Sequence, residues 1–358
     1  MKTIFVLALV CLMAALAADS KDQAPANLVK NGDFQNGPEG WALPRTKDEK
    51  TIKWDEDAGA GRAKCFKAAV TKDLQKLQQN LECSLLDDRL YELSADVKCD
   101  ADNTDLSLAV VCGYGVTRSF VSGKTFDTGK WARLSVKVMV RNDQEGDKRK
   151  QLIIEWSNKT LGDKAANVYL ANIQLKEIAR LAVDQPGRNQ ENLLRNGDFE
   201  NGLDQWANAR LGGFEISDKG FTGNCAALKA DKEQIRGAAQ KVVVANEDAL
   251  YRLSFKMRPE NTDGGKYYIG VMFIFCDLKD CPWGYYYLPL PSKQKNAWLD
   301  KTCYFYVEKL AFPAGQGGPA EQMKVKIDFY GNPAKVDTKM VYYFDNINLA
   351  KMEKALKP

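Results

Sequence analysis

Apolar and polar residues alternate with a period of two along most of this chain. The alternation is clearest in short segments that Gly, Asn and Asp residues separate: Cys65–Val70, Leu90–Val97, Leu106–Val111, Trp131–Val138, Gln151–Trp156 and Asn167–Leu175. Successive side chains of a strand point to opposite faces, so this pattern predicts strands with one buried face. Strands at this spacing predict an all-β sandwich or jelly roll. Only Leu74–Leu86 and the basic tail from Ala350 have a composition that suggests a helix.

The sequence pattern occurs twice in the chain. NLVKNGDFQNGPEGW at residues 27–41 returns as NLLRNGDFENGLDQW at residues 192–206. Four later anchors recur in the same order: Cys65 and Cys225, Leu90–Val97 and Leu250–Met257, Trp131 and Trp298, Val168–Leu175 and Tyr342–Leu349. This order predicts a duplicated domain, that is, two tandem jelly-roll β-sandwiches at residues 26–179 and 191–352. The linker is predicted at residues 180–190, around Pro186 and Gly187.

The repeated opening phrase predicts a short strand that enters a sheet between two tight turns. Each copy has two Asn-Gly pairs, which favour positive φ, and a Phe that points inward. Trp41 and Trp206 occupy one position in both copies, so we expect them in the core. Trp131 and Trp298 are interpreted in the same way.

The first 17 residues read as a signal peptide. Lys2 precedes an apolar run from Ile4 to Leu16, and Ala15-Leu-Ala17 is a small-residue cleavage site. The run is short for a membrane span, and no second apolar segment follows it. We therefore expect a secreted, extracellular protein without a membrane span.

Charge and composition exclude several function classes. The net charge is only +4 with both signs interspersed, so we expect no nucleic-acid partner. Histidine is absent, which removes the commonest general base and a common metal ligand. No nucleophile elbow, phosphate loop or dinucleotide fingerprint is present. Asp55 and Asp57 have the spacing of a glycosidase pair, but their polar, Gly-rich surroundings predict a loop, and we expect no enzyme.

Eight cysteines follow Cys11, four in each half. In an exported chain this number predicts two disulfides in each domain, and the sequence leaves three pairings open per domain. The local pairs Cys99–Cys112 and Cys276–Cys281 are the favoured ones. A zinc site is disfavoured because there is no His and no paired C-x-x-C spacing. Asn158-Lys-Thr160 is a sequon, so Asn158 is a predicted glycosylation site if the host is a eukaryote.

The opening phrase, the Leu-Tyr-x-Leu-Ser strand and the closing Tyr-Phe-Asp-Asn-Ile-x-Leu together resemble carbohydrate-binding modules of the CenC type, which bind cellulose and xylan. The resemblance covers both halves. It implies jelly rolls of the galactose-binding-like kind that bind a glycan on a face or cleft lined by aromatic residues, and that commonly hold a structural calcium ion.

The resemblance implies that Glu200 and Asp345 approach each other and, with backbone carbonyls, hold calcium. Oxygen ligands of this kind suit a hard cation, and two bare carboxylates would otherwise repel each other. The first copy has Gln35 and Ala171 at these positions. We therefore expect calcium in the second domain only.

Aromatic residues for stacking and polar groups for hydroxyls mark the predicted carbohydrate-binding residues. In the second copy these are Trp283, Tyr285 and Tyr287, and alternation sends Tyr286 to the other face. The first copy offers Tyr114 and Arg118. After Trp41 and Trp206, where the resembling modules carry cleft residues, neither copy has an aromatic.

Two functions stay open on this basis. One is a secreted, non-catalytic protein with two carbohydrate-binding modules, in which linked sites gain avidity on a polysaccharide. The other is a structural or adhesive extracellular protein that uses the fold for contacts with a protein partner and does not bind sugar.

Overall fold

The computed structural model describes residues 26–42, 52–55, 64–82, 85–86, 88–102, 104–112, 115–122, 128–139, 150–158, 166–182, 191–208, 215–229, 236–260, 269–280, 282–290, 296–309, 321–331, 341–352 and 356–357. Within these ranges the secondary structure is strand and turn, which confirms the all-β prediction. None of the described residues belongs to a helix able to cross a membrane.

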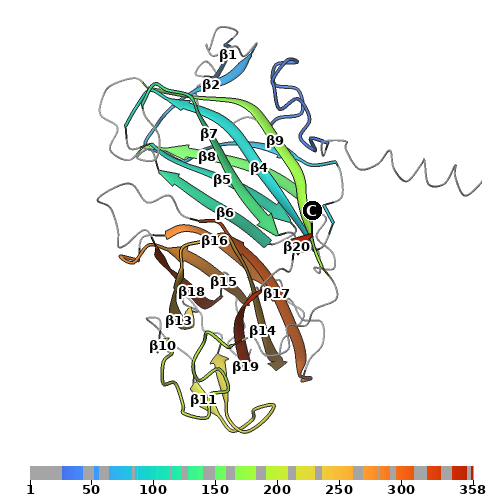
Figure 1. Ribbon diagram of the computed structural model, residues 1–358, viewed down its shortest axis with the longest axis vertical. Helices are drawn as coiled ribbons and strands as arrows, with labels where there is room; N and C mark the ends of the chain where they lie inside the picture. Colours follow the sequence, from blue (N-terminus) through green and yellow to red (C-terminus); the bar gives the residue numbers. More distant parts are fainter. Residues whose placement is uncertain are drawn as a thin grey trace, which may run out of the picture.

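The largest sheet has nine strands and runs through both halves of the chain (Figure 1). Its order is β10 (Ala207–Asn208), β13 (Arg236–Ala245), β18 (Gln322–Gly331), β15 (Ile269–Cys276), β16 (Pro282–Pro289), β6 (Gly115–Ser122), β5 (Asp105–Cys112), β8 (Lys150–Ser157) and β3 (Gln75–Asn80). The strands pair antiparallel throughout. The first copy thus meets the second where β6 pairs with β16.

Two smaller sheets each belong to one copy. The sheet of the first copy has the order β1 (Ile52–Asp55), β2 (Cys65–Ala69), β9 (Asn167–Leu181), β4 (Arg89–Cys99) and β7 (Ala132–Met139), and β20 (Leu356–Lys357) pairs with β9. The sheet of the second copy has the order β11 (Glu215–Ser217), β12 (Cys225–Lys229), β19 (Val341–Met352), β14 (Ala249–Glu260) and β17 (Leu299–Val307). The C-terminal strand therefore returns to the first copy.

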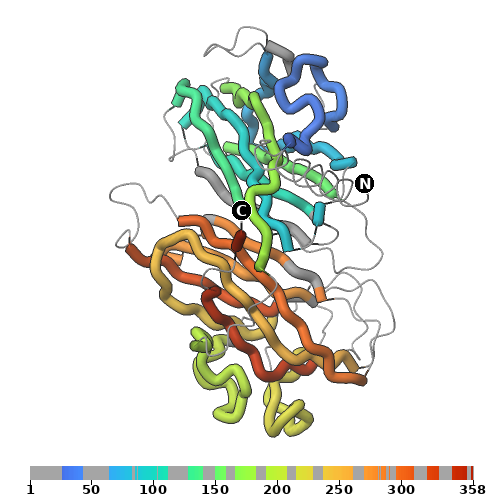
Figure 2. The backbone as a smooth tube through the Cα atoms, turned by 45° about the vertical axis from the view of Figure 1, so that its right-hand side comes forward, coloured from blue at the N-terminus to red at the C-terminus, as the bar shows by residue number. Residues whose placement is uncertain are grey.

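The buried apolar residues form two main cores, one made from residues 29–175 and one from residues 194–349. We call the two halves the first and the second lobe. Val110 of the first core pairs with Thr117, which pairs with Tyr286 of the second core. Because residues that pair directly share a face, both cores lie on the same side of the nine-stranded sheet. The two lobes thus share the nine-stranded sheet, and each covers its core with its own smaller sheet; Figure 2 shows the first lobe above the second.

A third apolar cluster fills the seam between the lobes. Its buried members are Leu90, Met139, Leu250, Tyr306 and Met352. The hydroxyl of Tyr286 lies 2.5 Å from the carbonyl oxygen of Tyr306 and 3.2 Å from that of Lys137, so it bonds both lobes. Next to it, the Lys137 ammonium of the first lobe lies 3.3 Å from Asp248 and 3.7 Å from Glu308 of the second.

The opening phrase is a series of turns, and the predicted strand is absent. Asn31 and Asn196 have φ values of 48° and 50°, and the following Phe34 and Phe199 have 57° and 58°. The chain still lies beside a strand, because Leu28 N–H donates to the Leu175 carbonyl and Leu193 N–H to the Leu349 carbonyl. The phrase therefore replaces a strand with hydrogen-bonded turns that are the same in both lobes.

The tryptophans divide into two groups. Trp41 and Trp206 are buried in the two cores, as predicted, and each indole N–H donates to the carbonyl of the turn Asn. Trp131 and Trp298 are only partly buried and pack in small clusters outside the cores, against Tyr169 and Tyr343 respectively. The prediction of a core position is therefore wrong for this pair.

The structure also differs from the expected helices and from the expected linker. The described part of Leu74–Leu86 contains strand β3, and the tail from Ala350 continues β19 and then forms β20, so neither is helical. β9 runs to Leu181, into the predicted linker at 180–190, whose residues 183–190 lie outside the described ranges. The signal peptide at 1–17 lies outside them too.

Candidate functional site

The face of the nine-stranded sheet that points away from the cores carries the predicted tyrosines. Tyr286 is buried in the second core, whereas Tyr285 and Tyr287 are half-buried on the opposite face, which confirms the predicted alternation. Ile274 and Met272 of β15 pair with these two tyrosines and are half-buried on the same face. Together they make a partly exposed apolar and aromatic surface.

An acidic side chain borders this surface. Asp328 of β18 pairs with Met272, so it lies on the tyrosine face one strand farther from the seam. It is only 8 % exposed. Its Oδ2 accepts a 2.7 Å hydrogen bond from the Lys326 ammonium, whereas Oδ1 is buried without a partner among the described residues. A buried carboxylate oxygen without a donor costs free energy.

The strands that carry the two predicted sugar-binding surfaces are neighbours. Arg118 of β6 pairs with Tyr285 of β16 across the seam. The side chain of Arg118, that of Trp283 at the β-bulge of β16, and the whole of Tyr114 lie outside the described part of the chain. Pairing of the two edge strands thus joins what the sequence predicted as one surface in each domain.

Part of this face is buried in the first lobe. Ser107, Ala109 and Val111 of β5 and Glu155 of β8 are at most 9 % exposed. Toward the outer edge of the sheet, Ile153 of β8 is half-buried, as are the two tyrosines, and Lys76 of β3 is exposed.

The predicted calcium residues come together at one loop of the second lobe. Asp345 is fully buried, and its Oδ2 accepts hydrogen bonds from the N–H groups of Phe221 and Thr222 at 2.8 and 3.2 Å. Glu200 Oε1 accepts one from Asn224 N–H at 2.9 Å. A Cβ on Gly223 would lie 2.1 Å from this Oε1, so the loop leaves the carboxylate room that only Gly provides.

The charge of Glu200 disfavours the ionised form of Asp345 in this loop. Burial and, to a smaller extent, the charge of Glu200 raise the pKa of Asp345, although three backbone N–H groups oppose the rise. Among the described residues no three His, Cys, Asp or Glu side chains gather as ligands, so a cation here would also need carbonyl or water oxygens.

The same place in the first lobe holds a lysine. Gln35 and Ala171 replace Glu200 and Asp345, and Lys64 occupies the position of Asn224 before the shared Cys. The Lys64 ammonium donates a 3.0 Å hydrogen bond to the carbonyl oxygen of Gln35. The first lobe thus places its own positive charge where the second lobe gathers carboxylates, a substitution that the sequence comparison of the acidic residues alone missed.

The cysteines do not follow the disulfide prediction. No disulfide occurs among the described residues, and Cys99, Cys225 and Cys276 are buried thiols. Cys99 lies 3.0 Å from the Thr104 hydroxyl, and Cys276 lies 3.7 Å from the Lys324 carbonyl. Burial raises the pKa of the Cys225 and Cys276 thiols to about 11, so both are poor nucleophiles. Cys83 and Cys281 lie outside the described ranges.

The structure also changes the interpretation of Asn158 and Asp55. Asn158 is 1 % exposed, and its amide donates to the Asp102 carbonyl at 2.8 Å, so the fold argues against a glycan on this side chain. The expected loop at Asp55 is part of strand β1, whereas Asp57 and the side chain of Asp55 lie outside the described part.

Comparison with solved structures finds carbohydrate-binding modules among the chains that this chain resembles, all at low identity and low TM-score. The tandem CBM22-1-CBM22-2 domain of Paenibacillus barcinonensis Xyn10C is 15 % identical at a TM-score of 0.32, over 93 % of this chain and 99 % of that one. A family 16 carbohydrate-binding module is 20 % identical at 0.31, over 42 % and 99 %. TmCBM61 in complex with β-1,4-galactotriose is 15 % identical at 0.32, over 43 % and 99 %. No family model and no curated protein matches the chain. Similarity this low gives no argument about the ligand.

Proposed function

We propose that the chain is a secreted, non-catalytic glycan-binding protein whose ligand lies across β15, β16 and β18 on the outer face of the nine-stranded sheet. The observation that carries the proposal is the pair of half-buried tyrosines, Tyr285 and Tyr287, beside the unpartnered Oδ1 of Asp328. The resemblance of the repeated motifs to CenC-type modules supports it.

The chemistry of this surface suits a sugar. Tyrosine rings supply flat apolar area for the C–H face of a pyranose, and Met272 and Ile274 extend it. The Asp328 carboxylate accepts hydrogen bonds from hydroxyl groups, which a neutral glycan offers in pairs on neighbouring carbons. Asp328 Oδ1 has almost no accessible surface, so a ligand hydroxyl would reach it only after the side chains around it move.

One polysaccharide-retention experiment tests the proposal. The intact protein is passed over a panel of insoluble and soluble polysaccharides beside the variants Tyr287→Ala and Asp328→Ala. We expect retention on at least one glycan and a loss of about tenfold or more in affinity for each variant, as for a stacking or buried polar contact worth over 1.4 kcal/mol.

Phe221→Ala is the matched control, because Phe221 is a 47 % exposed aromatic residue of the second lobe that contacts Trp298 at the opposite layer. It should bind as the wild type does. Retention on no polysaccharide would reject the proposal and favour the structural or adhesive function, with an extracellular protein partner.

We also propose that the second lobe alone holds a structural calcium ion. Glu200 and Asp345 would bind it, and the ion would neutralise the repulsion between the two carboxylates. In the first lobe the Lys64 ammonium supports the opposite expectation, because it places a positive charge at the Gln35 carbonyl.

A further inference from the structure

The repeated opening phrase carries two Asn-Gly pairs in each lobe. They are Asn31-Gly32 and Asn36-Gly37 in the first lobe and Asn196-Gly197 and Asn201-Gly202 in the second. Glycine has no Cβ to shield its backbone nitrogen, so this nitrogen can attack the side chain of the asparagine before it. The four pairs have the same sequence, but the fold places them in two different environments.

Hydrogen bonds hold the asparagine of the first pair in each lobe. Both N–H groups of the Asn31 amide donate, to the Gly37 carbonyl at 3.0 Å and to the Glu39 carbonyl at 3.1 Å. Its Oδ1 accepts from the Asn36 N–H at 3.1 Å. The Asn196 side chain makes the equivalent three hydrogen bonds in the second lobe. Loss of this amide as ammonia would break all of them.

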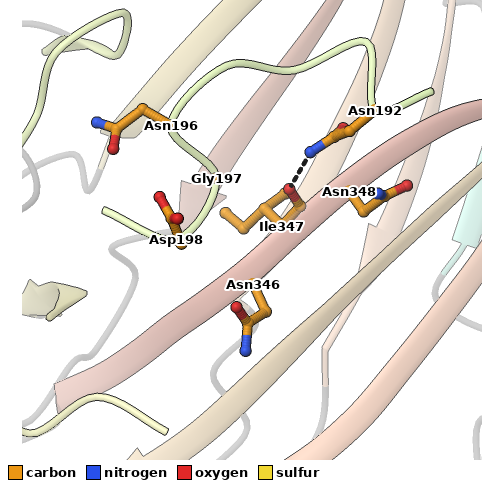
Figure 3. A pocket seen from close by; sticks show the side chains of 7 residues that line it. All are labelled: Asn192, Asn196, Gly197, Asp198, Asn346, Ile347 and Asn348. Atoms are coloured by element: carbon orange, nitrogen blue, oxygen red, sulfur yellow. Dashed lines mark hydrogen bonds between the residues drawn. The ribbon is translucent and has the colours of Figure 1, made fainter. Parts of the chain in front are cut away.

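The glycine of the first pair is held as well. Gly32 and Gly197 are buried, and their carbonyls accept 2.8 Å hydrogen bonds from the N–H groups of Ile173 and Ile347. A Cβ on either glycine would lie 2.0 Å from the isoleucine carbonyl oxygen. Figure 3 shows Gly197 beside Ile347 of β19. The backbone at this point has no room to bend toward the asparagine side chain.

The second pair of each lobe lies at the surface. Asn36 and Asn201 are exposed, and their side chains make no hydrogen bond within the described part of the chain. Gly37 and Gly202 have φ values of 60° and 64°, and a Cβ on either would meet no atom within 4 Å. The N–H of each glycine donates to the carbonyl of the Phe three residues before it at 3.0 Å. This turn hydrogen bond has to open before the nitrogen can attack.

We propose that Asn36 and Asn201 are sites of spontaneous deamidation, whereas Asn31 and Asn196 are protected from it. The backbone nitrogen of the next glycine loses its proton and forms a bond to Cγ of the asparagine. The bond from Cγ to Nδ2 breaks, and the amide nitrogen leaves with a proton as ammonia. Water then opens the cyclic imide at either of its carbonyl carbons and gives aspartate or isoaspartate.

Either product changes the turn. Both add a negative charge, which in the second lobe stands directly after Glu200 in the sequence. Isoaspartate also brings Cβ into the main chain, so the turn becomes longer. The Asn201 N–H that donates to the Asn196 side chain belongs to this part of the turn.

The test is peptide mapping of the intact protein after incubation at 37 °C and pH 9, with mass spectrometry that separates aspartate from isoaspartate. Trypsin releases residues 31–45 and 196–210, and each peptide holds one asparagine of each kind. We expect deamidation at residues 36 and 201 to be faster than at 31 and 196 by about tenfold or more, because hydrogen bonds protect the latter. The rate should rise with pH, since the attacking nitrogen must lose its proton. In protein unfolded in urea, the four sites should react at similar rates.

The double variant Asn36→Gln with Asn201→Gln is the control. Both side chains are exposed, so the variant should fold as the wild type does. It should lose most of the deamidation in both peptides, because glutamine would have to close a larger ring. Equal rates at all four sites of the folded protein, no reaction at residues 36 and 201, or an unchanged total in the double variant would overturn the proposal.

Discussion

The two lobes agree in the residues that build the fold and differ in the residues that hold positive charge. Both use Asn and Phe at positive φ, and both place Gly32 or Gly197 against a carbonyl oxygen of the last strand. In two places, however, the first lobe carries its own cation where the second presents oxygen acceptors. Lys64 matches Asn224 of the loop that holds Glu200 and Asp345, and Arg133, which donates to Gln174, matches Asp300.

This comparison separates the residues of the repeat that build the fold from those that differ in function. A residue that is kept in both copies serves the turn and core that they share. Lys64 of the first lobe donates to a carbonyl of that lobe, whereas the second lobe has the carboxylates Glu200 and Asp345 at the matching place. The second lobe is therefore the lobe to which we assign the calcium ion.

The largest expected effect is on stability, and it tests the turn that the two lobes share. Gly32→Ala and Gly197→Ala each put a methyl group 2.0 Å from a carbonyl oxygen of Ile173 or Ile347, so backbone must move. We expect a loss of about 3 kcal/mol in the free energy of unfolding for each, at the upper end for overpacking. Urea denaturation measures it. A loss below about 1 kcal/mol in one lobe only would show that the two turns are not equivalent.

A smaller, pH-dependent effect tests the seam that joins the lobes. Burial raises the pKa of Glu308, although the backbone N–H and the ammonium of Lys137 oppose the rise. An acid whose pKa is raised by folding binds protons more tightly in the native state, so its contribution to stability grows as the pH falls through the folded pKa. Wild type should therefore gain stability relative to Glu308→Gln as the pH is lowered from 7.

Thermal unfolding of both proteins across this pH range gives the difference. Asp248 beside it behaves in the opposite way, because the Lys309 N–H and Lys137 lower its pKa against the effect of burial. Comparison with the single variant removes that contribution, since Asp248 is present in both proteins. A difference that does not change with pH would contradict the burial of Glu308 at the seam.

The smallest effect tests the internal cation of the first lobe. Lys64→Met keeps the length of the side chain and removes the hydrogen bond to the Gln35 carbonyl, which is partly exposed. We expect a loss of about 0.5 kcal/mol in the free energy of unfolding, typical of an exposed charged contact. Lys72→Met, an exposed lysine of the same lobe, is the control. Equal values for both variants would remove the special role of Lys64.

The sequence predicted what depends on local periodicity. Alternation placed Tyr286 in the core and Tyr285 and Tyr287 on the other face, and the duplication placed Trp41 and Trp206 at equal core positions. The proximity of Glu200 and Asp345 was also predicted, but from the family resemblance and not from the spacing of the residues.

What depends on contacts between distant strands could not be predicted. The pairing of β6 with β16 uses two exposed strand edges, and either edge satisfies the same alternation pattern when it is alone. From the sequence, Asp328 is predicted to be an ordinary outward-facing residue of β18. Only the structure shows that it is buried and that its Oδ1 has no hydrogen-bond donor among the described residues. The number of cysteines predicted disulfides. A cysteine that is a buried free thiol occurs in the same apolar sequence context as one that forms a disulfide, so the sequence does not distinguish them.

The number of calcium ions bound per chain tests most directly the claim that the lobes share a fold and differ in their sites. Isothermal titration of chelator-treated protein should give one calcium ion per chain for the wild type and none for Asp345→Asn, whereas Lys64→Met should leave the value at one. Two ions per chain, or one that persists in Asp345→Asn, would contradict the account.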